Sequence, residues 1–358
     1  MLLRYFAIAV ALFFAVNIGA SGSAASMASA YGGRVINKRL ALVLMAVFAW
    51  LGSVFAGTAV IKTVSSGIMP QEFMRLDVAL IILISASLTL FLANLLKIPL
   101  STSQVTVGAV AAAGIYFGSL NKTAIALIVA AWVIIPFASY GIAYFLGKQV
   151  EPRFMKWLTS FGSEEKFRKI LSWVVIASGC WVAFSVGANN AANAIGPLVG
   201  AKLVDVRSGA ILGGAFIGLG ALVLGGRTLH TTGREITELC VVKASFVSLT
   251  AGSLIIVASL LGIPSPLAQA TTLAIVGMGT AKCGREETFN NGVVGRILKI
   301  WVISPALSFL LAFTIIHTKL NVFEHQQGNV FVSVILSVVL ISAVVSLLLA
   351  KKRIGLSK

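Results

Sequence analysis

The chain has few charged residues. Only 11% of its 358 residues are Asp, Glu, Lys or Arg, whereas 58% are hydrophobic, and the mean hydropathy is +0.99. A soluble protein must cover its surface with polar groups, so this balance excludes a soluble protein and indicates lipid as the solvent. Seven apolar stretches are long enough to cross the roughly 30 Å of bilayer hydrocarbon as helices: Leu40–Ile61, Val78–Leu96, Ala124–Leu146, Ser208–Leu224, Phe246–Gly262, Ile297–Ile316 and Val330–Leu349.

Acidic residues and cysteines are scarce. There are 11 Asp and Glu residues, and the three cysteines, Cys180, Cys240 and Cys283, lie far apart without metal-ligand spacing. This predicts neither a disulfide nor a metal site. Neither a nucleophile–base pair nor a glycine-rich phosphate loop stands out, so we expect no enzyme, no catalytic residues and no cofactor.

Basic residues give the chain a formal net charge of +17, which by itself would suit a nucleic-acid-binding protein. They occur, however, in short clusters between the apolar stretches: Arg34–Arg39, Lys148–Lys169, Arg227–Lys243, Lys282–Lys299 and Lys351–Lys358. This pattern is typical of loops that face anionic lipid headgroups. It predicts a multi-pass plasma-membrane protein that contacts lipid and binds no nucleic acid.

An internal repeat organises the chain. Shifted by 168 residues, Phe13–Ile68 falls on Trp181–Ile236 without a gap, and further blocks match at shifts of 165 and 169. The matched pairs include Gly19 with Gly187, Arg39 with Arg207, Gly52 with Gly220, Gln104 with Gln269, Trp132 with Trp301, and Pro136 with Pro305. Chance similarity between apolar segments would match Leu, Val and Ala instead, so the order of these residues indicates a duplication.

The duplication also decides how the N-terminus is interpreted. Arg4, the apolar run Tyr5–Val16 and the small residues after it mimic a cleaved signal peptide. Because part of this segment is repeated in the second half, we expect it to be retained in the fold.

The basic clusters and the repeat together predict an all-α polytopic membrane protein. With Arg34–Arg39 and the Lys351–Lys358 tail both cytoplasmic, each half has about five spans and one extra span follows. An odd number per half inverts the second half. The expected divisions are a first repeat (1–147), a basic cytoplasmic linker (148–169), an inverted second repeat (170–317) and an extra span with a basic tail (318–358). Inverted repeats are typical of alternating-access transporters, whose substrate sites lie near the membrane midplane.

Four stretches rich in Gly, Pro, Ser and Asn predict broken or re-entrant helices at the midplane. They are Asn17–Ser29, Pro99–Thr106, Ser185–Pro197 and Pro264–Thr272, and they form two repeat-related pairs. Irregular backbone at membrane depth survives only where protein buries it or a cavity adjoins it. A helix that begins there presents free N–H groups and a dipole that favours an anion.

Neutral hydrogen-bond donors in these stretches are the candidate substrate ligands: Ser21, Gly22, Ser23, Ser101, Thr102, Ser103, Gln104, Asn189, Asn190, Asn193 and Gln269. Small and hydroxyl residues also pack transmembrane helices together, so for any single Ser or Gly both interpretations stay open. The Asn189, Asn190 and Asn193 cluster favours a binding function, because each buried amide needs a partner or a ligand.

The same residues resemble a known family. The run Gly187–Gly196 resembles the G-A-N-D-x-x-N-A-x-G signature of the inorganic phosphate transporter family. Gly19–Ser26 is similar to the degenerate first-half copy of that signature, and Pro99–Gln104 is similar to the family's P-V-S-T-T-H element. The resemblance implies import of phosphate, or of sulfate in a bacterial branch, coupled to a sodium or proton gradient. The chain resembles the sulfate permease branch.

Departures from the family pattern favour sulfate. Asn190 and Gly22 stand where the signature has Asp, and Gln104 stands where the family has His. Phosphate near pH 7 carries a proton that a carboxylate can accept, whereas fully deprotonated sulfate would only be repelled by one. Loss of two acidic groups also removes candidate sodium ligands and favours proton symport. Phosphate, thiosulfate or molybdate as the substrate, and an anion channel as the class, stay open, as does a homodimer.

Proton symport requires a titratable group in the polar interior. The candidates for this coupling-ion role are Asp77, His230, Glu235 and Glu238. Ionisable residues near span ends are commonly interfacial, so Glu235 and Glu238 have a second interpretation as loop partners of nearby Arg and Lys residues.

Overall fold

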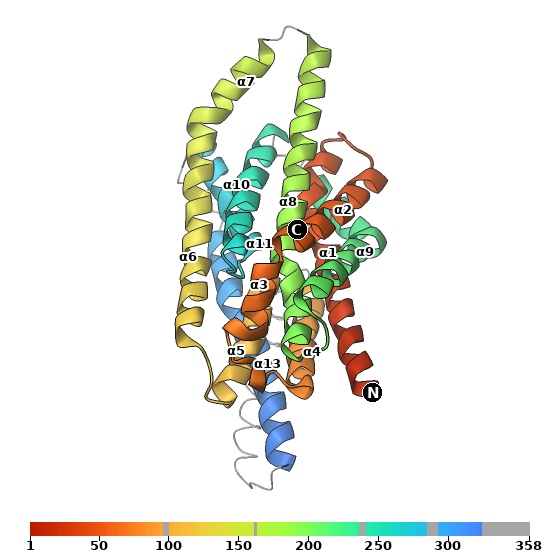
Figure 1. The fold of residues 1–358 in the computed structure, drawn as a ribbon. Helices are drawn as coiled ribbons and strands as arrows, with labels where there is room; N and C mark the ends of the chain where they lie inside the picture. Colours follow the sequence, from red (N-terminus) through yellow and green to blue (C-terminus); the bar gives the residue numbers. More distant parts are fainter. Residues whose placement is uncertain (96–99, 161–162, 236–240, 285–292, 324–358) are drawn as a thin grey trace.

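The computed structural model describes residues 1–95, 100–160, 163–235, 241–284 and 293–323, and its regular elements in these ranges are all helices (Figure 1). The first half contains α1 (Leu2–Gly32), α2 (Lys38–Ala56), α3 (Thr58–Lys62), α4 (Leu76–Leu95), α5 (Thr102–Tyr116) and α6 (Lys122–Phe145). The second contains α8 (Glu164–Gly200), α9 (Val206–Glu235), α10 (Val241–Leu260), α11 (Leu267–Cys283) and α13 (Val293–Phe323).

Seven helical stretches within the described residues are long and apolar enough to cross a membrane. They begin at Leu2, Lys38, Leu76, Lys122, Glu165, Val206 and Val241. This confirms the prediction of an all-helical, multi-pass membrane protein. The apolar stretch Val330–Leu349, predicted as the extra C-terminal span, lies outside the described residues.

Polar side chains fix where several helices begin. Asn37 accepts a hydrogen bond from the Leu40 amide at 2.9 Å before α2, and Asn121 accepts one from the Ala124 amide at 3.1 Å before α6. Each side chain satisfies an amide of the first turn that has no partner within its own helix.

Helix positions follow the sequence repeat. Helix α2 begins at Lys38 and α9 at Val206, which are counterparts at the shift of 168. Helix α5 begins at Thr102 and α11 at Leu267, which are counterparts at the shift of 165. Two pairs of helix starts therefore coincide with the repeat found in the sequence.

Glycine contacts between the halves are reciprocal. A Cβ atom on Gly19 of α1 would collide with the carbonyl of Ile217 on α9, and one on Gly187 of α8 would collide with the carbonyl of Ala49 on α2. Gly187 is the repeat counterpart of Gly19, and Ile217 is that of Ala49. A two-fold relation between the halves produces such exchanged contacts, and only glycine permits so close a backbone approach.

A second pair of contacts repeats the pattern. Gly52 of α2 lies against the carbonyl of Phe184 on α8, and Gly220 of α9 lies against the carbonyl of Val16 on α1. In Figure 1, α1 begins at the lower end of the molecule and α8 at the upper end, so these counterparts run in opposite directions. These features support the inverted duplication, whose boundaries and orientation in the membrane stay predictions.

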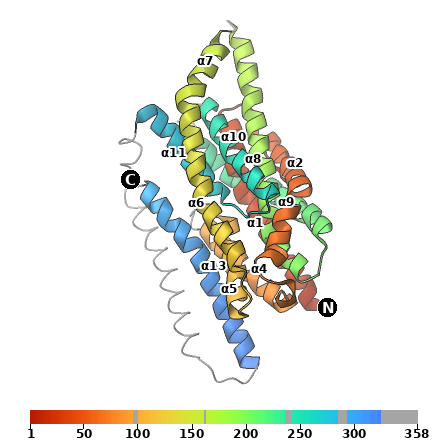
Figure 2. The same cartoon turned by 60° about the vertical axis from the view of Figure 1, so that its left-hand side comes forward.

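The other helices are exchanged in the same way: α6 packs along α11, and α13 packs along α5 (Figure 2). Between the halves, α6 continues through the π-helical turn Leu146–Val150 into α7 (Glu151–Thr159). The described part of the predicted linker 148–169 is therefore largely helical. Together, α7 and the start of α8 project beyond the other helices (Figure 1).

Two of the four predicted helix breaks are wrong. Asn17–Ser29 lies within the continuous helix α1, and Ser185–Pro197 lies within the continuous helix α8. In α1, serine side chains bond to carbonyls of their own helix, as when Ser23 Oγ donates to the Gly19 carbonyl at 2.9 Å. Their small size lets helices pack closely and does not interrupt them.

The other two predicted breaks coincide with helix ends. Helix α5 begins within Pro99–Thr106 and α11 begins within Pro264–Thr272, with 15 and 17 residues respectively. Both are shorter than the roughly 20 residues of a typical span, and their first turns contain buried polar residues such as Ser103 and Gln269.

Candidate functional site

A cavity of about 200 Å³ lies between helices of both halves. Its walls come from α1, α4, α5, α8 and α11, and its lining residues are Ile18, Ser21, Gly22, Ala25, Leu90, Leu100, Ser101, Thr102, Val186, Asn190, Leu267 and Ala268. Three pairs among them are repeat counterparts: Ile18 with Val186, Gly22 with Asn190, and Thr102 with Leu267. The cavity therefore lies at the interface of the two repeats.

The first turns of two short helices face this cavity. Ser101 and Thr102 contribute the start of α5, and Leu267 and Ala268 contribute the start of α11. The first N–H groups of a helix have no acceptor within it, and the dipole makes this end partially positive. Two such ends facing one cavity create a favourable place for negative charge.

Asn190 of α8 has a fixed amide orientation. Its Oδ1 accepts hydrogen bonds from Thr102 Oγ1 at 3.0 Å and from Asn189 Nδ2 at 3.0 Å. Asn193 Nδ2 at 3.3 Å and Ser103 Oγ at 3.5 Å are further donors to the same oxygen. With the oxygen occupied, the amide's NH₂ group has no acceptor among the described residues and is left for the cavity.

Asn189 joins the two short helices to α8. Its Oδ1 accepts from the Ser265 amide at 3.0 Å, and its Nδ2 donates to the Ser265 carbonyl at 2.7 Å. The same Nδ2 donates to Ser103 Oγ on α5 at 2.9 Å. Asn189 is fully buried and does not line the cavity, so its geometry is that of a positioning residue.

A glutamine pair lies behind the cavity wall. Gln269 Nε2 of α11 donates to Gln104 Oε1 of α5 at 2.7 Å, and Ser304 Oγ of α13 donates to the same oxygen at 3.3 Å. Both glutamines are at least 97% buried. They tie the two short helices together close to their N-termini.

The cavity wall carries no formal charge. Its lining residues are serine, threonine, asparagine, glycine and aliphatic side chains, without an ionisable group among them. Close by, Asn193 Oδ1 and Thr106 Oγ1 are buried and have no hydrogen-bond partner among the described residues. The electrostatics of the cavity thus come from amide and hydroxyl dipoles and from the two helix ends.

The predicted ligands divide into three groups. Ser21, Gly22, Ser101, Thr102 and Asn190 line the cavity. A second group supports that wall from behind: Ser103, Gln104, Asn189, Asn193 and Gln269. Ser23 belongs to neither group, because it packs against Gly225 of α9.

Several contributors to the site were not singled out from the sequence. Besides five aliphatic lining residues, they are Ala25, Ala268 and Ser304, and Ser304 has Ile135 as its repeat counterpart. For the two alanines a signal existed, since their repeat counterparts are Asn193 and Ser103.

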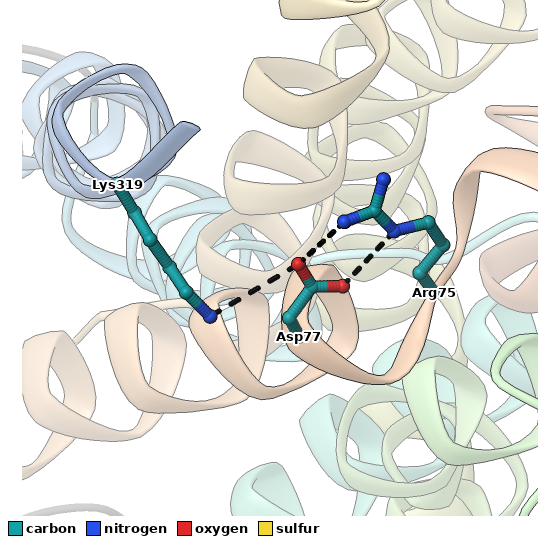
Figure 3. A network of polar contacts seen from close by, with 3 residues as sticks. All are labelled: Arg75, Asp77 and Lys319. Carbon is teal, nitrogen blue, oxygen red and sulfur yellow. Dashed lines mark hydrogen bonds and ion pairs between the residues drawn. The ribbon is translucent and has the colours of Figure 1, made fainter. Parts of the chain in front are cut away.

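Asp77, a predicted coupling residue, lies in an ion-pair network far from the cavity (Figure 3). Its Oδ2 is 2.9 Å from Arg75 Nη2 and 4.0 Å from Lys319 Nζ on α13. Asp77 is in the first turn of α4, whereas Leu90 of the same helix lines the cavity. At a rise of 1.5 Å per residue these positions are about 20 Å apart.

The other coupling candidates, His230, Glu235 and Glu238, are not among the residues that line the cavity. His230 is exposed on α9, with its ring centroid 6.4 Å from that of Tyr31. Glu235 is the last residue of α9, and Glu238 lies outside the described residues.

Comparisons with known proteins agree with this architecture. The model of the phosphate transporter family matches residues 18–312. Sulfate permease CysP of Bacillus subtilis is 43% identical to this chain over 332 residues, covering 92% of each protein. A putative phosphate permease of Methanocaldococcus jannaschii is 26% identical over 301 residues, covering 83% of this chain and 92% of that protein.

A solved structure described as the sodium-dependent phosphate transporter has a similar fold. Its TM-score is 0.71 at 24% identity, and the match covers 87% of this chain and 96% of that chain. Fold and relatives together define a multi-pass membrane transporter for an anion, and not an enzyme. The chain belongs to the phosphate transporter family.

Proposed function

We propose that this protein is a secondary transporter that imports sulfate together with protons. The cavity at the repeat interface is the substrate site in this proposal. Ser101 and Asn190 are the direct side-chain contacts, Thr102 orients Asn190, and the first turns of α5 and α11 supply backbone N–H groups. Sulfate transport is also the activity named for the Bacillus subtilis relative.

The carrying observation is the orientation of Asn190. Because its oxygen is held by Thr102 and Asn189, its NH₂ group is the part available to a ligand. An NH₂ group donates to any oxyanion oxygen and cannot accept a proton from a substrate hydroxyl. Fully deprotonated sulfate has acceptors only, so its needs match this wall.

Phosphate fits the same wall less well. Hydrogen phosphate brings at least one O–H group, which needs an acceptor once water is excluded. A carboxylate in place of the Asn190 amide would offer such an acceptor, and it would repel sulfate across a dry site. Selectivity therefore depends on one nitrogen atom standing where the family signature has an oxygen.

Proton coupling is proposed because the cavity lining has no carboxylate that could bind sodium. Sodium sites in proteins are built from oxygen ligands, and a carboxylate among them offsets the ion's charge. The described cavity lining contains no carboxylate. A proton gradient can drive the uptake of a dianion without a dedicated metal site. In this proposal the titratable group that carries the proton lies outside the cavity lining.

The test is uptake of radiolabelled sulfate by cells lacking their own sulfate importer. We expect accumulation that excess phosphate does not suppress, that persists when sodium is replaced by potassium, and that a protonophore abolishes. Strict sodium dependence would overturn the coupling proposal. Uptake that equilibrates without accumulating would instead indicate a channel, and entry of phosphate in place of sulfate would overturn the substrate.

A further inference from the structure

Five residues that line the cavity are the repeat counterparts of five polar residues that are hydrogen-bonded to one another. The polar residues are Thr102, Ser103, Asn189, Asn190 and Asn193. Their repeat counterparts are, in the same order, Leu267, Ala268, Ser21, Gly22 and Ala25. All five counterparts line the cavity. One side of the repeat interface is thus filled by amides and hydroxyls, and the matching place on the other side is open.

The open space follows from side-chain size. Asn190 and Asn193 each carry an amide group beyond Cβ. Their counterparts are smaller: Gly22 has no side chain, and the side chain of Ala25 ends at Cβ. Asn193 is fully buried, but its counterpart Ala25 is exposed although it lies well inside the 31-residue helix α1. Ala25 therefore faces the opening that a larger side chain would occupy.

Gly22 and Ala25 differ in how much change they tolerate. A Cβ on Gly22 would lie 2.9 Å from Met45 Cε and 3.1 Å from Val186 Cγ1, so that position is already tightly packed. Ala25 is exposed to the cavity and can carry a longer side chain without displacing the backbone. Of the two, Ala25 is the residue at which the size of the cavity can be varied.

We propose that Ala25 is a specificity-determining residue that sets the largest oxyanion the cavity admits. Asn190 lines the same cavity, is 92% buried, and has an NH₂ group without an acceptor among the described residues. The anion is held between this donor and the wall made by Ala25. The inference rests on the proposed function in taking the cavity as the substrate site, and it does not depend on which oxyanion is carried.

The experiment compares Ala25→Val and Ala25→Gly with wild-type protein. Uptake of labelled sulfate is measured with selenate and molybdate as competitors, since these tetrahedral oxyanions are progressively larger. We expect Ala25→Val to weaken competition by molybdate about tenfold or more relative to sulfate, the scale on which methyl-sized changes alter pocket selectivity. Ala25→Gly should strengthen competition by molybdate.

A matched control separates size selection from damage to the helix bundle. Ala130 of α6 is exposed and does not line the cavity, so Ala130→Val adds the same two methyl groups elsewhere. It should leave the strength of molybdate competition relative to sulfate unchanged. The same unchanged ratio in both Ala25 variants, each with normal membrane abundance, would overturn the inference.

Failure of the sulfate proposal gives a different pattern. If wild-type protein takes up phosphate and not sulfate, the same variants are tested with labelled phosphate against arsenate, its larger analogue. A shift in that ratio would uphold the role of Ala25 while the substrate is corrected. If the competition ratio between the carried anion and its larger analogue is the same in wild-type protein and both Ala25 variants, Ala25 does not determine specificity.

Discussion

Gln104 of α5 and Gln269 of α11 are counterparts in the sequence repeat, and their side chains are hydrogen-bonded to each other at 2.7 Å. A residue can touch its own repeat counterpart only close to the axis that relates the two halves. If the halves are related as the inverted duplication predicts, that axis passes beside the N-termini of the two short helices. The cavity, which is lined by three counterpart pairs, lies in the same place.

Replacing Asn190 by Asp should reverse the preference among anions. The carboxylate would keep one oxygen on Thr102 and Asn189 and present the other, charged, to the cavity. We expect sulfate uptake to fall about tenfold or more and competition by phosphate to rise, because the new charge repels a dianion and accepts a proton from hydrogen phosphate. Uptake assays with both labelled anions measure this, and an unchanged ratio would count against the carboxylate argument.

Removing one partner of the glutamine pair should destabilise the protein. Gln104→Leu leaves Gln269 Nε2 buried without its acceptor, which costs about 1–3 kcal/mol. The double variant Gln104→Leu with Gln269→Leu removes both polar groups and should recover much of that loss. Thermal unfolding in detergent measures the cycle, and strictly additive losses would argue that the two side chains do not interact.

Glycines between the halves should be replaceable only where space permits. Gly52→Ala and Gly220→Ala drive a methyl group into the carbonyls of Phe184 and Val16, so both variants should lower thermal stability. On Gly141 of α6, by contrast, an added Cβ would have no neighbouring atom within 4 Å. Gly141→Ala should be neutral or stabilising by up to about 1 kcal/mol. Equal effects on the melting temperature at all three positions would contradict this packing.

Asp77→Asn should change stability little and leave the KM for sulfate unaltered. Arg75 is 58% exposed, so solvent screens its pair with Asp77, and such pairs contribute about 0–1 kcal/mol. Asp77 also lies about 20 Å along α4 from the cavity wall. Kinetics of sulfate uptake by the variant check this, and a large rise in KM would place Asp77 in the substrate site after all.

Much of the fold could be predicted from the sequence because the duplication left matching glycines, prolines and glutamines. The repeat shift aligns the starts of α2 with α9 and of α5 with α11. The continuity of α1 and α8 was not predicted. Runs such as Gly19–Ser26 suit both a broken helix and close helix packing, and only the position of neighbouring helices decides between them.

The candidate site was predicted in its chemistry more than in its geometry. Asn190 and Thr102 were expected to contact a ligand, and both line the cavity. The sequence could not show that Asn190 lines the cavity whereas Asn189 does not, because both are asparagines. Asn189 differs in that its side chain is bonded to the Ser265 backbone. Ala25 has no polar group, so its place in the cavity wall emerges only when repeat counterparts are compared in space.

Uptake by purified protein in proteoliposomes tests the central claim most directly. Vesicles with an imposed inward proton gradient and no sodium are supplied with labelled sulfate or labelled phosphate in parallel. Concentrative accumulation of sulfate, with phosphate excluded and the signal lost when the gradient is collapsed, is the predicted result. Accumulation of phosphate in place of sulfate would contradict the assignment of the amide-lined cavity to a fully deprotonated oxyanion.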